Sequence, residues 1–367
     1  MKAMKSAWIA AGMIVQTVIW TPTPGAHAAD SGQPARHHEV SIAGTDITPG
    51  NQSWPSAVNT SGEVVGGHSV GGGTHGFVWR DGVLTDITPL RGGTYSFAEA
   101  VNATGDAVGT SGDYGNSHPF RWHDGVSVEL PALGGTGSAN ALNDNGVVVG
   151  NAYQAASGSN KAVLWRDGVL SVLPDLGGTY SAARFVNESG QVLIYSVSPA
   201  GEQHALFWSA GVMTDLGPGV PLGLNDDGQA LIGSVQTSQG TTRPFLWQAG
   251  QKTQLPTAVT SVAGLNQSGQ VVGQYTVAAT GASDGFLWDG HALTDVGAIS
   301  PVGLNNYGQV LADNATGTVV WYQGQVTTLT PQTGPAGPPV ISDGGLVAGE
   351  VRSTGDTDVW QVSRVSG

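Results

Sequence analysis

The chain has no cysteine, few charged residues and no long uninterrupted apolar segment. None of its 367 residues is cysteine, and only 11% are charged, against about 25% in an average soluble protein. Disulfides and a lipid anchor on cysteine are therefore excluded. The 57 glycines disfavour long helices, because glycine costs about 1 kcal/mol at each helical position. With 40% hydrophobic residues and 11 tryptophans, the chain buries too much apolar surface to be disordered, which leaves an all-β fold rich in turns.

The N-terminus has the three regions of a secretory signal peptide. Lys2 and Lys5 precede an apolar run over residues 7–20, and the small-residue sequence Ala26-His27-Ala28 follows. We predict cleavage after Ala28. The apolar run is shorter than the roughly 20 residues of a membrane-spanning helix. The sequence therefore predicts a protein that is exported, secreted or periplasmic, and not inserted in a membrane.

The charge balance restricts the partners. Without residues 1–28 the chain has 11 basic and 27 acidic residues, a net charge of −16. A surface this acidic repels phosphate backbones and anionic lipid surfaces. Nucleic acid is therefore not an expected partner.

A four-part unit recurs eight times along the chain. One landmark is an Asn-x-x-Gly turn, which begins at Asn59, Asn102, Asn143, Asn187, Asn225, Asn266 and Asn305, with Ser342 in the last copy. The other is a tryptophan at the end of a short, mainly apolar stretch, at Trp79, Trp122, Trp165, Trp208, Trp247, Trp288, Trp321 and Trp360. Successive tryptophans are 33 to 43 residues apart.

Each unit is predicted to form four short strands. In the second copy they are residues 96–102, 106–111, 119–124 and 126–131, with glycine-containing turns closing both hairpins. A repeat of about 40 residues with four strands is typical of a β-propeller blade. We expect an eight-bladed propeller over residues 44–367, preceded by a lead-in over 29–43. Because residues 44–50 read as a lone fourth strand and the chain ends after a third strand, residues 45–48 are expected to close the last blade.

The unit resembles the bacterial extracellular HAF repeat over nearly all of the chain that follows residue 28. The resemblance is carried by HGFVWRDG from His75, HPFRWHDG from His118, HALFWSAG from His204 and the linking sequence PDLGGTYSAARFVN from Pro174. Lys161, Arg243 and Asp284 stand where the repeat has its histidine. The resemblance implies export and a repeat fold, and it implies no particular reaction.

Several side chains are candidates for binding. One tryptophan per unit at a fixed place indicates packing between blades. By contrast Trp54, Tyr95, Phe97 and Tyr180 are placed in the connections that enter first strands, which open near the axis of a propeller. His68 and His118 are further candidates on the same face, as are His75 and His204, although their place in the repeat favours a structural hydrogen bond.

The residue three positions before each turn asparagine separates the units into two halves. It is Ser56, Glu99, Asn140 and Arg184 in the first four units, and Leu222, Ala263, Val302 and Pro339 in the last four. If first strands line the axis, a polar wall faces an apolar wall, which suits an amphipathic small molecule or a peptide end. In a catalytic site Glu99 would be the general acid/base and Arg184 an anion clamp. The alternative is a purely structural role, in which Glu99 and Arg184 are paired with each other or solvated in a water-filled channel.

Motifs for metal, cofactor or nucleophile chemistry are missing or lack their structural context. No H-E-x-x-H is present, and the G-x-S-x-G matches at residues 67–71 and 281–285 are not followed by a helix pattern. We therefore expect no metal and no cofactor. The favoured function is a monomeric exported protein that binds a small molecule, glycan or peptide at the axial face. The alternatives are a lyase, hydrolase or cyclase at the channel mouth, and a structural protein of the envelope or matrix.

Overall fold

The strands predicted from the repeat are present throughout the described chain. The computed structural model describes residues 40–113, 115–315, 317–330, 338–351 and 353–362, all within one unit of residues 38–367. The predicted signal peptide, residues 1–28, and the lead-in as far as residue 39 lie outside the described residues. Helical structure in the described part is limited to one 3₁₀ turn, η1 (Leu90–Gly92). No helix of these residues is long and apolar enough to cross a bilayer.

Strands that follow one another pair in an antiparallel manner in groups of four, which we number as sheets 1 to 8 in chain order; one parallel pair, Thr74 with Tyr95, connects sheets 1 and 2. Sheet 1 contains β3 (Ser53–Val58), β4 (Val64–Val70), β5 (Gly73–Arg80) and β6 (Val83–Ile87). Sheet 2 contains β7 (Tyr95–Val101), β8 (Ala107–Asp113), β9 (Asn116–His123) and β10 (Val126–Glu129). Sheet 3 contains β11 (Gly134–Leu142), β12 (Val148–Gln154), β13 (Ser159–Arg166) and β14 (Val169–Val172). Sheet 4 contains β15 (Ser181–Val186), β16 (Val192–Val197), β17 (Gln203–Ser209) and β18 (Val212–Pro218).

The second half of the chain repeats this pattern. Sheet 5 contains β19 (Val220–Leu224), β20 (Ala230–Gly233), β23 (Phe245–Gln248) and β24 (Gln251–Gln254), with the small hairpin β21 (Gln236–Thr237) and β22 (Gly240–Thr241) inserted. Sheet 6 contains β25 (Val259–Leu265), β26 (Val271–Thr276), β27 (Ser283–Trp288) and β28 (Leu293–Gly297). Sheet 7 contains β29 (Ser300–Leu304), β30 (Val310–Asn314), β31 (Gly317–Tyr322) and β32 (Gln325–Thr330). Sheet 8 contains β33 (Val340–Ile341), β34 (Leu346–Glu350), β35 (Thr357–Gln361) and the early strand β2 (Thr45–Asp46).

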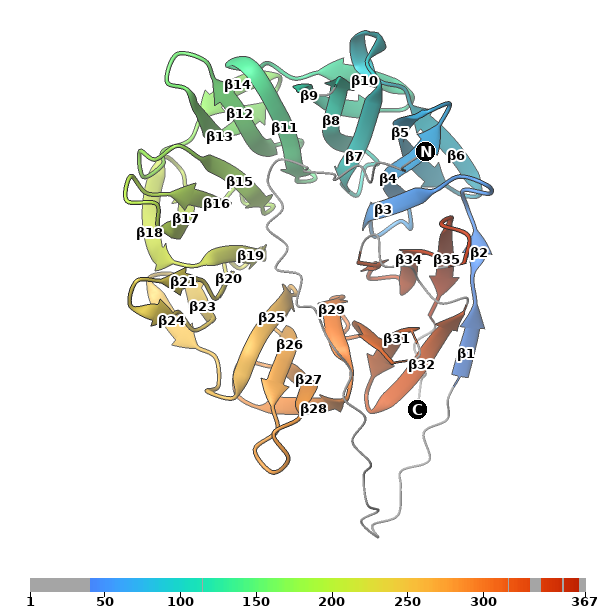
Figure 1. Ribbon diagram of the computed structural model, residues 1–367, viewed down its shortest axis with the longest axis vertical. Coiled ribbons are helices and arrows are strands. Elements are labelled where there is room, and N and C mark those ends of the chain that lie inside the picture. Colours follow the sequence, from blue (N-terminus) through green and yellow to red (C-terminus); the bar gives the residue numbers. More distant parts are fainter. Residues whose placement is uncertain (1–39, 114, 316, 331–337, 352, 363–367) are drawn as a thin grey trace, which may run out of the picture. The chain divides into compact units, whose positions relative to one another are not determined.

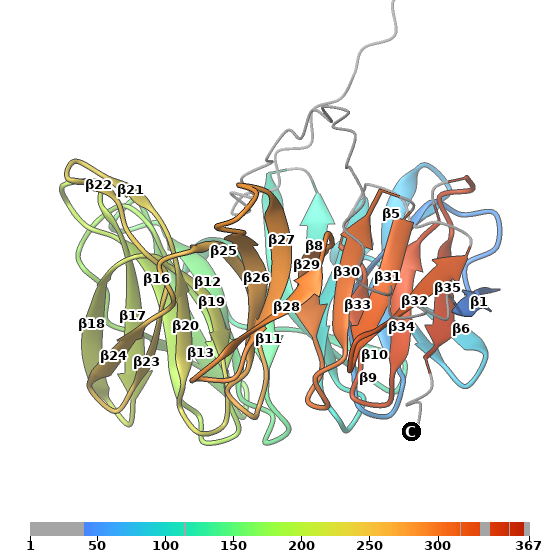
Figure 2. The same cartoon turned by 90° about the horizontal axis from the view of Figure 1, so that it is seen from below.

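The sheets stand around a common centre, with first strands such as β7, β15 and β25 nearest to it and outer strands such as β10, β18 and β28 at the rim (Figure 1). Seen from the side, the strands run along the axis between two faces that carry the turns (Figure 2). This radial arrangement of four-stranded antiparallel sheets is that of a β-propeller. The predicted all-β propeller class is confirmed.

First strands bulge at one recurring position. The pairing of first and second strands skips one residue in seven of the sheets, at Ser56, Glu99, Asn140, Arg184, Leu222, Ala263 and Val302. A bulged residue is left out of the ladder and its strand bends there. These are the residues that lie three positions before the turn asparagines, so the position picked out in the sequence is a structural feature of the innermost strand.

Adjacent sheets pack face to face and form the core. Between sheets 1 and 2, for example, Val65, Val78 and Ile87 meet Ala98 and Phe120. Six of the eight repeat tryptophans are less than 9% exposed, and the other two, Trp79 and Trp208, pack against core clusters from their half-buried positions. The predicted core role of this series is confirmed.

The early part of the chain joins the last two sheets. β2 pairs antiparallel with β35, and the Ile47 amide donates to the Thr357 carbonyl at 2.9 Å, as expected for residues 45–48. β1 (Val40–Ala43) pairs parallel with β32 and adds a fifth strand to sheet 7. This pairing was not predicted, because residues 40–43 were assigned to the lead-in. The segment has no strand partner nearby in sequence and pairs with the outer edge of β32, almost 300 residues later in the chain.

Candidate functional site

A ladder of buried asparagine side chains links neighbouring sheets around the axis. Each turn asparagine donates from Nδ2 to the backbone carbonyl of its counterpart in the next sheet, at 2.8 to 3.2 Å. Its Oδ1 accepts the amide of the residue four positions on, which closes its own turn. The series runs from Asn59 to Asn305, whose acceptor is Ser342. The links between sheets were not predicted, because a turn alone explains an Asn-x-x-Gly sequence; the asparagine at the same place in seven units was the signal for them.

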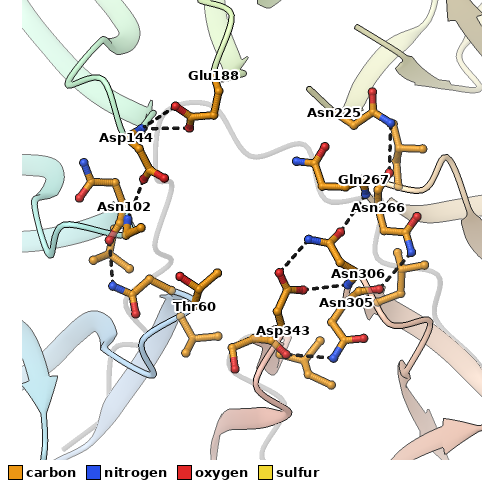
Figure 3. A pocket seen from close by; sticks show the side chains of 18 of the residues that line it. Thr60, Asn102, Asp144, Glu188, Asn225, Asn266, Gln267, Asn305, Asn306 and Asp343 are labelled. Carbon is orange, nitrogen blue, oxygen red and sulfur yellow. Dashed lines mark hydrogen bonds between the residues drawn. The ribbon is translucent and has the colours of Figure 1, made fainter. Parts of the chain in front are cut away.

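The residue after each asparagine builds a second ring at the mouth of the axis. Its side-chain oxygen accepts the backbone amide of the equivalent residue one sheet earlier. Such bonds run from Ala103 to Asp144, Asp144 to Glu188, Glu188 to Asp226, Asp226 to Gln267, Gln267 to Asn306 and Asn306 to Asp343, at 2.7 to 3.0 Å. Figure 3 shows several of these side chains around the central opening.

The two rings surround a cavity of about 330 Å³. The residue before each asparagine adds an apolar layer to its wall, formed by Val58, Val101, Leu142, Leu224, Leu265, Leu304 and Ile341. The wall therefore changes from carboxylates and amides to aliphatic side chains along the strands. A group that enters from this mouth meets polar atoms first and apolar atoms second.

Negative charge is concentrated on one side of the mouth. Asp144, Glu188 and Asp226 come from the consecutive sheets 3, 4 and 5. Burial raises the pKa of Glu188, and the charges of Asp144 and Asp226 act in the same direction, while the amides of Asp144 and Asn145 oppose them. Because the carboxylates disfavour one another, a cationic or hydroxyl-rich group is better matched to this side than an anion.

Glu99 and Arg184 lie at bulges on the innermost strands of sheets 2 and 4. Burial raises the pKa of Glu99 to about 7, and the charge of Arg184 acts in the opposite direction. The charges of the two residues therefore interact although sheet 3 stands between their strands. Leu222, Ala263 and Val302 occupy the bulges of sheets 5 to 7.

Ser56 and Asn140 occupy the other two polar bulge positions. Ser56 Oγ donates to the carbonyl of Ala98, and Asn140 Nδ2 donates to the carbonyl of Ala183 at 2.9 Å. Asn140 Oδ1 also accepts from Ser138 Oγ. These bonds connect each sheet with the next, so the two side chains stabilise the ring as well as lining its inner wall.

The aromatic candidates are placed differently from the prediction. Trp54 lies within β3, and Tyr95 and Phe97 lie within β7, so they are strand residues and not part of the connections. The strands begin earlier because Trp54 pairs with Gly67 and Tyr95 with Gly112. The Phe97 ring covers Gly67 of the neighbouring sheet, where any side chain would clash with it. Only Tyr180 precedes its strand, as expected, and its ring meets Tyr195 edge to face at 5.9 Å.

The histidines pair with carboxylates of their own sheets. His68 Nε2 lies 2.6 Å from Asp86 Oδ1, and His75 Nδ1 lies 3.1 Å from Asp86 Oδ2. His118 approaches Glu129 at 3.1 Å. The same pairing joins His204 to Asp215 at 2.9 Å and Lys161 to Asp175 at 2.8 Å. The structural role is therefore supported, and His68, which is only 3% exposed, is not open to a ligand.

No family model and no curated protein sequence matches the chain. Among solved structures, it is similar to a gluconolactonase from Xanthomonas campestris, with 13% identity and a TM-score of 0.39 over 87% of this chain and 89% of that one. It is also similar to YCF48 bound to D1 peptide, with 12% identity and a TM-score of 0.41 over 88% and 96% of the two chains. TolB from Acinetobacter baumannii matches at 9% identity and a TM-score of 0.37, over 79% of this chain and 60% of that one.

Proposed function

We propose that the protein is an exported binding protein that recognises a small molecule, a glycan or a peptide on the propeller axis. The observation that carries this proposal is the inner wall. The bulged residues of the innermost strands, Glu99 and Arg184 among them, are polar in sheets 1 to 4 and apolar in sheets 5 to 7. The same strands lead to a cavity of about 330 Å³, within the range of about 300 to 1,000 Å³ that is typical of small-ligand sites.

The proposal includes the form of the scaffold. The eight sheets are the blades of one closed, monomeric propeller, in which β2 supplies the outer strand of the last blade. The pairing of β2 with β35 supports this closure. A buried chain of hydroxyl groups also supports it, because Ser53 Oγ lies 2.7 Å from both Thr48 Oγ1 and Thr357 Oγ1. Export rests on the predicted signal peptide, and membership of the HAF-repeat proteins rests on the repeat sequence.

A ligand screen with matched variants tests the binding function. Panels of defined oligosaccharides, peptides and small polar molecules are screened by thermal shift, and hits are titrated by calorimetry. We expect Arg184→Ala and Glu99→Gln to weaken a true axial ligand by about tenfold or more, since each removes a charge-assisted contact of about 1.5–3 kcal/mol. Asp167→Asn, an exposed change on the outer turn of sheet 3, is the control. A hit that binds all three variants equally does not occupy the axis.

The second candidate is an enzyme of the lyase, hydrolase or cyclase type at the same place. The observation in its favour is Glu99, since burial raises its pKa to about 7, where a carboxyl group both donates and accepts protons at neutral pH. The axial hits are incubated with the protein and analysed for conversion. Turnover that disappears in Glu99→Gln, with calorimetric binding retained, supports catalysis, whereas binding with no conversion by the wild type supports a receptor.

A further inference from the structure

The junction between the first and last sheets carries an unusual group of acidic residues. β2 is only two residues long, and its Asp46 stands directly opposite Asp358 of β35. Asp356 lies two residues before Asp358, just ahead of β35. Like charges directly opposite one another in an antiparallel pair are destabilising.

The equivalent position in the other sheets shows how unusual Asp358 is. The position lies two residues before the repeat tryptophan. In seven sheets it holds an apolar residue that is at most 4% exposed: Phe77, Phe120, Val163, Leu206, Phe245, Phe286 and Val319. In sheet 8 it is Asp358, which is 6% exposed. A carboxylate therefore replaces a core side chain.

The basic partner found in other sheets is also replaced. In sheet 1 the outer-strand Asp86 is paired with His75, two residues before the buried Phe77. In sheet 8 the outer-strand acid is Asp46, and the residue at the histidine position is Asp356. Three carboxylates thus occupy places that elsewhere hold an acid, a base and an apolar side chain.

The described residues around Asp358 supply no compensating charge. Gly44 passes so close to the Asp358 carboxylate and the Trp360 indole that a side chain there would clash. β34 presents Gly349 opposite Asp358, and its Glu350 is opposite Thr357, so it projects to the other face. Trp360, on the same face, packs on sheet 7, where the only charged residue of β30, β31 and β32 is Asp313, which accepts from Thr318. Among the described residues no hydrogen bond or ion pair is found for the Asp358 carboxylate.

We propose that this junction is a pH-dependent latch, which is firmly closed while the Asp358 carboxyl group opposite Asp46 is protonated. Proton loss places two carboxylates opposite each other on the shortest strand of the closure, so β2 detaches more readily in neutral or alkaline solution than in acid. Burial, with the charges of Asp46 and Asp356, raises the pKa of Asp358 to about 6, which sets the pH range of the change. The inference rests on the proposed closure by β2 and is independent of the axial ligand.

Hydrogen exchange of the full chain between pH 5 and pH 8 tests the latch. The Ile47 amide, bonded to the Thr357 carbonyl, has an exact counterpart in sheet 2, where the Leu130 amide donates to the Pro119 carbonyl. After correction for intrinsic rates, we expect the protection of Ile47 relative to Leu130 to fall by about ten- to a hundredfold as pH rises, since each pKa unit is worth a factor of ten. We expect this change to be absent in Asp358→Asn and in Asp358→Val. Valine is the residue at the equivalent position of sheet 7, Val319.

The controls separate the alternatives. Asp167→Asn removes an exposed acid elsewhere and should leave the pH dependence intact. A constant protection ratio in the wild type, or the same pH dependence in Asp358→Asn, overturns the latch. If millimolar calcium chloride at pH 8 restores the Ile47 protection seen at pH 5, the junction is a cation site and the latch is overturned. Among the described residues, no three acidic or histidine side chains are placed to hold a metal ion. An Ile47 amide that is unprotected at every pH in every variant overturns the closure itself.

Discussion

One asparagine side chain in each of sheets 1 to 7 makes two structural hydrogen bonds. Asn266, for example, accepts the amide of Gln270 within its own turn and donates to the carbonyl of Asn305 in the next sheet. It is 4% exposed, so water cannot replace either bond. Asn59-Thr60-Ser61 and Asn187-Glu188-Ser189 match the N-x-S glycosylation sequence, but in the folded protein both asparagine side chains are buried and bonded in the ladder.

We expect Asn266→Ala to lower the free energy of unfolding by about 1–3 kcal/mol, because it leaves a buried amide and a buried carbonyl without their partner. Urea denaturation followed by tryptophan fluorescence measures the change. Ser268→Ala, in the same turn, is the control. A loss as small as that of the control contradicts a stabilising role for the ladder.

The ladder stops at the eighth unit, where Ser342 stands in place of asparagine. Ser342 Oγ accepts the Leu346 amide within its own turn, and serine is too short to reach the next sheet. Ser342→Asn is therefore expected to add the missing link to Asn59 and to increase the free energy of unfolding by about 0.5–1.5 kcal/mol. Unchanged or reduced stability would contradict the proposed contact between the first and last sheets.

The hairpins between third and fourth strands depend on backbone conformations that favour particular residues. Asp81 and Gly82 both have positive φ, 48° and 82°, as a type I′ turn requires. Asp occupies the first of these positions in sheets 1 to 3, whereas sheets 4 and 5 have Ala210 and Ala249 at φ of 48° and 46°. Alanine has no short polar group to stabilise the left-handed conformation.

Exchanging these residues provides a matched pair of variants. Ala210→Asn is expected to stabilise the protein by about 1 kcal/mol, and Asp167→Ala to destabilise it by a similar amount, since aspartate and asparagine tolerate positive φ better than alanine. Both positions are on exposed turns, so packing is not altered. Thermal unfolding of the two variants beside the wild type measures the effect, and shifts in the same direction would contradict this explanation.

The pH dependence of stability belongs to the molecule as a whole. Glu99 and Asp358 have pKa values raised to about 7 and about 6, so the folded chain binds more protons than the unfolded chain between about pH 4 and pH 7. The contribution of Glu99 and Asp358 to the free energy of unfolding is therefore fully present below about pH 4 and decreases as pH rises through that range. Asp175 has the opposite sign: burial raises its pKa, but the hydrogen bond and charge of Lys161 outweigh burial and lower it.

We therefore expect unfolding temperature to pass through a maximum in mildly acidic solution and to fall toward pH 8. Glu99→Gln and Asp358→Asn should each reduce the fall, and the double variant should reduce it further, because the two sites lie on different sheets and act independently. Calorimetric scans from pH 4 to pH 8 measure this dependence. A wild type that becomes more stable from pH 5 to pH 8 contradicts it.

The strand pattern, the turns and the packing tryptophans were determined by the sequence alone, because each depends on residues close together in the chain and repeated in every unit. The position of Glu99 and Arg184 was also predictable, since the register of the repeat places them three residues before the turn. The tertiary structure decided what depends on contacts between units. The asparagine ladder, the partner of β1 and the burial of Asp358 all need neighbouring sheets to be in place, and the acid–base pairs of the histidines need the strands of one sheet to be paired in register. Local pattern determines the strands, and only the arrangement of the strands and sheets around the axis determines which side chains meet.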